Sequence, residues 1–115
     1  MRTAKITLAL VFLMLLQVPA TATAASQEQH LDAIARMGEL NGIALQCHYL
    51  DQMRRIKQVL IRYLPKERAL GEWFEKTTSD SFMGFMQKRE ECPGLIEFEQ
   101  DLDQASQRIA EVFGS

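Results

Sequence analysis

Residues with specialised chemistry are scarce in this sequence. Its 115 residues include two cysteines, two histidines, three prolines and six glycines. No glycine-rich phosphate loop, C-x-x-C pair or zinc-ligand spacing occurs, and no nucleophile has local sequence support for a catalytic triad. We therefore expect no enzyme activity and no cofactor.

Charge and hydrophobicity exclude two further classes of protein. The formal net charge is −2, which provides no basic excess for contacting nucleic acid. Hydrophobic residues make up 47% of the chain, too many for a disordered segment. The length is that of one small domain.

The beginning of the chain has the pattern of an export signal. Two basic residues precede an apolar run at 6–16, and the small residues Ala22-Thr23-Ala24 follow it. As a helix the run would cover roughly 16 Å, about half of a bilayer's hydrocarbon core, so it is too short for an anchor. The sequence predicts a cleavable signal peptide over 1–24, which meets the membrane only during export. A domain over 25–115 follows, located in a bacterial periplasm or, alternatively, secreted.

Export gives the two cysteines a specific meaning. Disulfides persist in oxidising compartments, and Cys47 and Cys92 allow only one intramolecular pairing. Closing so long a loop removes unfolded-state entropy worth on the order of 4 kcal/mol. We predict a Cys47–Cys92 disulfide; a reactive thiol, an intermolecular bridge and a metal site are the alternatives.

A helical pattern begins directly after the predicted cleavage site. Ser26 and Gln29 have the spacing of a capping box, and apolar or small residues then recur at intervals of three and four. Pro65 ends this pattern. We expect one long helix over 26–64 with a single buried stripe, and Asn41-Gly42 leaves a turn between two helices as the alternative. The stripe consists of Leu31, Ala35, Gly38, Gly42, Leu45, Tyr49, Ile56, Val59 and Tyr63.

Two more helical segments are predicted after the proline. The first has an aromatic face and ends before Cys92-Pro93-Gly94, and the second runs from Leu95 to Phe113. No segment alternates with period two, so the predicted fold is all-α: a small up-and-down helical bundle of three to four helices with one disulfide. The aromatic face comprises Leu70, Trp73, Phe74, Thr77, Phe82, Phe85 and Met86, and the last stripe comprises Leu95, Phe98, Leu102, Ala105, Ile109 and Val112.

Two details predict how the helices pack. Gly38 and Gly42 would each cost about 1 kcal/mol in a helix, so we expect a neighbouring helix to approach them closely. If the second helix were straight and antiparallel to a long first helix, Cys92 would lie roughly 13 Å along the axis from Cys47, too far for a disulfide. Either the second helix breaks near 77–81 or the first helix breaks near Asn41-Gly42. We predict the break at 77–81, where Thr and Ser are weak helix formers.

Charge is unevenly distributed along the chain. Residues 54–68 are strongly basic, whereas residues 90–103 contain six acids and no base. These segments either face one another inside the domain, form ordinary solvated faces, or present a basic end to an acidic partner protein, an anionic lipid or a cell-wall polymer. By residue type, the candidate partner-binding residues are Arg55, Arg62 and Trp73.

The sequence thus predicts a periplasmic protein that acts by binding another protein, as an inhibitor, immunity factor, chaperone or assembly subunit does. The alternative is a carrier of a small ligand or of a soft metal such as copper(I). Met83, Met86 and His48 would then supply thioether and imidazole ligands. Methionine at helical spacing also serves as core filler, which favours the protein-binding interpretation.

Overall fold

Four helices and one disulfide make up the described part of the chain. The computed structural model describes residues 25–114, and these contain no strand. The Cys47–Cys92 disulfide is formed, so the predicted all-α fold with one disulfide is confirmed. The predicted signal peptide at 1–24 lies outside the described residues. The helices are α1 (Gln27–Cys47), α2 (Leu50–Tyr63), α3 (Arg68–Lys88) and α4 (Leu95–Phe113).

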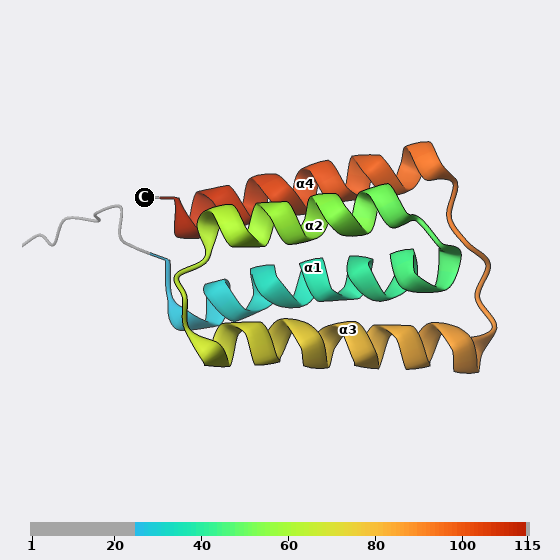
Figure 1. Cartoon of the computed structure of the whole chain (residues 1–115), viewed down its shortest axis with the longest axis horizontal. Helices are drawn as coiled ribbons and strands as arrows, with labels where there is room; N and C mark the ends of the chain where they lie inside the picture. The colour runs from blue at the N-terminus through green and yellow to red at the C-terminus, as the bar shows by residue number, and fades with distance from the viewer. Residues whose placement is uncertain (1–24, 115) are drawn as a thin grey trace, which may run out of the picture.

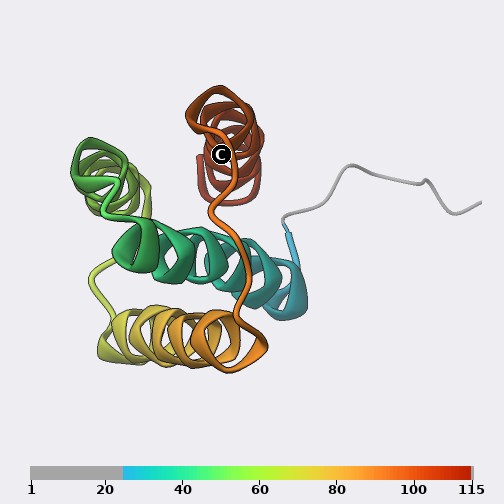
Figure 2. The ribbon, with the colours of Figure 1, turned by 90° about the vertical axis from the view of Figure 1, so that its right-hand side faces the viewer.

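Helix α1 is the centre of the bundle. Successive helices run in opposite directions (Figure 1), and Figure 2 shows α2 and α4 on one side of α1 and α3 on the other. α1 contacts each of the other three helices and α2 contacts α4, whereas the α3 backbone approaches neither α2 nor α4. None of the four helices combines the length and apolar character needed to cross a bilayer.

The central position of α1 makes its burial broader than the sequence pattern predicted. The predicted single stripe is wrong at Leu45, which is 37% exposed, and it omits the most buried residues of the helix. Because α1 packs against helices on two sides, apolar residues around much of its circumference are buried. They are Ala33, Ile34, Met37, Leu40 and Ala44.

Helix α4 follows its predicted stripe because it packs through one face only. The stripe is buried from Phe98 to Val112, and only Leu95, in the first turn, is exposed. The capping box at the start of α1 is also confirmed. Ser26 Oγ accepts from the Gln29 N–H across 3.2 Å, and Gln29 Oε1 accepts from the Ser26 N–H across 2.9 Å.

The first helical segment breaks at His48. This residue adopts a left-handed conformation, with φ 59° and ψ 36°, and its N–H donates to carbonyls of the last turn of α1. Both predictions for this region, one helix over 26–64 and a turn at Asn41-Gly42, are therefore wrong. Histidine is one of the few non-glycine residues enriched in this conformation, so the chain can turn here without a glycine or proline to mark the turn.

The predicted break at 77–81 is also wrong, because α3 is continuous. The prediction assumed a long first helix. Since α1 ends at Cys47, α3 runs parallel to it and the two helices end at the same side of the bundle (Figure 1). Cys92 follows α3 closely and reaches Cys47 with a Cα–Cα distance of 5.7 Å, which suits a disulfide.

The Thr and Ser residues of α3 face the two glycines of α1. A Cβ atom at Gly38 would lie 1.9 Å from Thr77 Oγ1, and one at Gly42 would lie 2.6 Å from Ser81 Oγ and 2.7 Å from the Phe82 nitrogen. The predicted close approach of a neighbouring helix is therefore confirmed.

Two hydrogen bonds cross the same contact. The Ser81 hydroxyl donates to the Glu39 carbonyl across 2.7 Å, and Asn41 Nδ2 donates to Thr78 Oγ1 across 3.3 Å. Short polar side chains thus pair the two helices where larger apolar side chains would hold them apart.

Replacing Gly42 with alanine tests this contact. The added methyl group would collide with the α3 backbone, so we expect Gly42→Ala to lower the free energy of unfolding by about 1–3 kcal/mol. Gly84→Ala is the matched control: nothing lies within 4 Å of its Cβ position, and alanine there should raise stability by about 0.5–1 kcal/mol. Urea denaturation followed by circular dichroism measures both changes. Equal effects of the two substitutions would contradict the close contact.

Removing the disulfide tests how much it contributes to the free energy of unfolding. The bridge spans 45 residues, so we expect the Cys47→Ser/Cys92→Ser variant to lose about 4 kcal/mol of unfolding free energy. Denaturation of the oxidised wild type, the reduced wild type and the double variant checks this expectation. The last two should agree, because both lack the same covalent link. An unchanged midpoint in both would rule out a stabilising role.

Candidate protein-binding groove

An apolar groove lies where α2 ends and α3 begins. It has a volume of about 520 Å³, and its walls come from the last turns of α2, the connection at 64–67 and the first turns of α3. Leu60 and Leu70 are 8% and 5% exposed and belong to the core, whereas Ile61 is 79% exposed. The groove thus joins the core to an open apolar wall. Its apolar lining consists of Leu60, Ile61, Leu64, Pro65, Leu70 and Phe74.

The groove exists because α2 and α3 pack on different sides of α1. Their backbones do not approach one another, and only a short connection joins them. Leu64 is extended before Pro65, and the Glu67 N–H donates to the Pro65 carbonyl across 2.8 Å. The Leu70 N–H then donates to the Glu67 carbonyl across 3.1 Å. These bonds hold the connection that lines the groove between the two helices.

Basic side chains surround the apolar lining. Lys57, Lys66 and Arg68 lie on the rim, with Glu67 as the one acid among the lining residues. Arg68 Nε lies 3.4 Å from the Glu72 carboxylate, but both side chains are largely exposed, so this pair contributes little. Neither lysine forms an ion pair within the described part of the chain. An apolar floor with a basic rim suits a ligand that combines apolar and acidic groups.

None of the three predicted partner-binding residues lines the groove. Arg55 on α2 pairs with Asp103 on α4, so the basic and acidic segments meet inside the domain at this point. Arg62 is exposed near the end of α2. Trp73 is half-buried on α3, and its indole N–H donates to the Leu31 carbonyl of α1 across 2.8 Å.

Sequence reasoning named Leu70 and Phe74 on an aromatic face but did not identify the groove. Ile61 carries the clearest signal, because it is a large, exposed apolar residue within the basic segment 54–68, four residues from both Lys57 and Pro65. Leu64 and Phe74 lie beside the same groove only in the folded chain. Their approach depends on how α2 and α3 pack around α1, which no local pattern encodes.

The alternative metal ligands lie elsewhere on the surface. Met83 and Met86 are 47% and 50% exposed on α3, and His48 is exposed at the turn between α1 and α2. Both cysteine sulfurs are used by the disulfide. Residues 25–114 contain no group of three or more His, Cys, Asp or Glu side chains placed to hold a metal ion. A soft-metal site would therefore depend on the thioethers and the imidazole.

The chain matches no protein-family model, no curated protein and no solved structure.

An apolar anion should bind in this groove. We expect 1-anilinonaphthalene-8-sulfonate to gain fluorescence with the native protein, because its rings suit the apolar lining and its sulfonate suits the basic rim. Ile61→Glu should abolish most of the gain, because its carboxylate repels the anion. Met86→Glu places the same charge at a 50% exposed apolar site near the other end of α3 and should retain the gain. A titration in which both variants, or neither, lose the fluorescence would locate binding elsewhere.

Proposed function

We propose that this chain is a non-enzymatic interaction protein of the periplasm that binds an acidic, amphipathic protein segment in the α2–α3 groove. The observation that carries the proposal is the exposed apolar wall at Ile61 beside Lys57 and Lys66, which have no ion-pair partner among the described residues. An apolar surface rimmed by polar groups is characteristic of interaction sites. The disulfide supports an oxidising compartment.

The groove has apolar side chains on two walls. Leu60 and Ile61 come from the last turn of α2, Leu64 directly follows that helix, and Leu70 and Phe74 lie one turn apart on α3. A short segment laid between the walls would bury its apolar side chains against both of them.

The charge of the groove restricts which segments can bind. Carboxylates on the flanks of the ligand would face the rim residues Lys57, Lys66 and Arg68. Such exposed charges chiefly raise the association rate and the specificity, while apolar burial supplies most of the affinity. We therefore expect binding that weakens with added salt but is not abolished by it.

A carrier of a small ligand or soft metal is the second candidate. The volume of about 520 Å³ lies within the range of small-molecule pockets, and the exposed thioethers of Met83 and Met86 favour copper(I) as a metal. Anaerobic titration with copper(I) separates the candidates. Thermal stabilisation by the metal that disappears in a Met83→Leu/Met86→Leu variant would favour the carrier.

Capture with matched variants tests protein binding. Immobilised wild type, Ile61→Glu and Met86→Glu are exposed to a periplasmic extract, and proteins that only Ile61→Glu fails to retain are purified. We expect at least one to bind the wild type directly in calorimetry, with affinity lowered about ten-fold or more by Ile61→Glu. If no retained protein binds directly, or if both variants bind it equally, the groove is not the interface.

A further inference from the structure

The end of the molecule opposite the groove carries an exposed segment that is both apolar and acidic. Leu95 and Ile96, in the first turn of α4, are 46% and 75% exposed. Glu91 and Glu97 flank them in the sequence and are exposed as well. We call these four residues the acidic tip. Figure 1 shows the start of α4 at one end of the bundle and the connection between α2 and α3 at the other.

The tip is exposed because α4 begins before its buried stripe does. The first buried residue of α4 is Phe98, and the helix starts at Gly94 without a side-chain cap. The preceding turn therefore places two large aliphatic side chains in water. Packing within the domain gives no reason for them, whereas a binding surface does.

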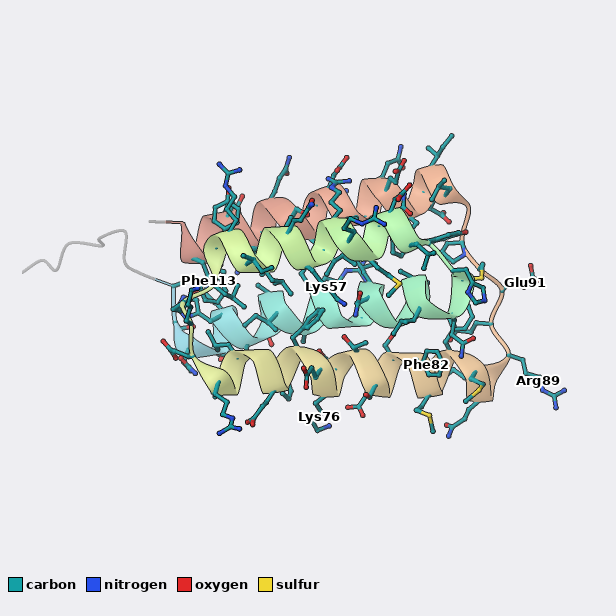
Figure 3. All side chains as sticks on the ribbon, in the orientation of Figure 1. Lys57, Lys76, Phe82, Arg89, Glu91 and Phe113 are labelled. Carbon is teal, nitrogen blue, oxygen red and sulfur yellow. A yellow bond between two sulfur atoms is a disulfide. The ribbon has the colours of Figure 1, made fainter. Side chains whose placement is uncertain are left out.

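The carboxylates of the tip differ from most other acids of residues 90–103. Three acids of that segment are engaged inside the domain, by Arg36, Arg55 and Gln52. Glu91 and Glu97 form no ion pair with another described residue. In Figure 3 the neighbouring Arg89 extends from the same end of the bundle in a different direction from Glu91. The segment 91–97 therefore carries two exposed carboxylates and two exposed aliphatic side chains.

We propose that the acidic segment bound in the groove is the acidic tip of a second copy of this chain. This inference rests on the groove function proposed above and names its ligand. The two aliphatic side chains of the tip enter the groove beside Ile61, and its two carboxylates face Lys57 and Lys66. Because the tip and the groove lie at opposite ends, a chain cannot bind its own tip, and the contact forms between copies.

Sedimentation velocity of the oxidised protein tests the association. The wild type should exceed the monomer mass increasingly with concentration at low ionic strength and return toward the monomer at high salt. Ile61→Glu disables the groove and Ile96→Lys disables the tip, and both residues are at least 75% exposed, so the fold should persist by circular dichroism. Each variant alone should self-associate with an affinity at least about ten-fold lower than that of the wild type. Lys76→Glu, on the outer face of α3 (Figure 3), is the charge control and should associate like the wild type.

An equimolar mixture of the two variants gives the sharper result. Ile96→Lys keeps an intact groove and Ile61→Glu keeps an intact tip, so one contact can form between them. We expect a one-to-one dimer in the mixture that neither variant forms alone. Monomers in the mixture, a wild type that is monomeric at every concentration, or association that both variants retain would each overturn the inference.

The outcomes also separate this inference from the broader function. A wild type that remains monomeric but binds a captured protein through Ile61 overturns self-association alone. A wild type that binds neither itself nor a captured protein through the groove overturns both proposals.

Discussion

The contact between the glycines of α1 and the hydroxyl side chains of α3 determines the shape of this molecule. Gly38 and Gly42 each weaken an isolated helix by about 1 kcal/mol, and a close neighbour offsets that loss. Thr77 and Ser81 are short enough to permit the approach. Because α3 occupies one side of α1, α2 and α4 pack on the other side. α2 and α3 therefore lie on opposite sides of α1, and the groove lies where their adjoining ends meet the connection at 64–67.

The disulfide and the turn at His48 align this helix pair along its length. α1 ends at Cys47, and its partner Cys92 lies shortly after the end of α3. A covalent link at one end and a steric fit at the centre thus act on the same two helices. On the side of α1 opposite α3, the ion pair between Arg55 and Asp103 joins α2 to α4. Asp103 thus partly neutralises the charge of Arg55, which would otherwise add to the basic surface of α2.

Much of the fold could be predicted from the sequence, because its signals are local. The apolar stripe of α4, the capping box at Ser26, the pairing of two cysteines and the need to cover two helical glycines all follow from spacing and composition. The turn at His48 could not be predicted, because a left-handed histidine has no sequence signature as clear as glycine or proline. The break predicted at 77–81 was also wrong. The low helix propensity of the hydroxyl residues there is a local property, whereas their role is to pack against α1 in the folded chain.

Only the basic part of the candidate site could be predicted from the sequence. The basic segment 54–68 was evident, and two of its lysines lie on the groove rim. Its apolar lining forms only where the ends of α2 and α3 adjoin in the folded chain. The most direct test of this arrangement is a nuclear Overhauser spectrum of the oxidised protein. We expect cross-peaks from the Gly38 and Gly42 α-protons to the side chains of Thr77 and Ser81. Their absence, with cross-peaks joining the middle of α3 to α2 or α4 instead, would contradict the arrangement that creates the groove.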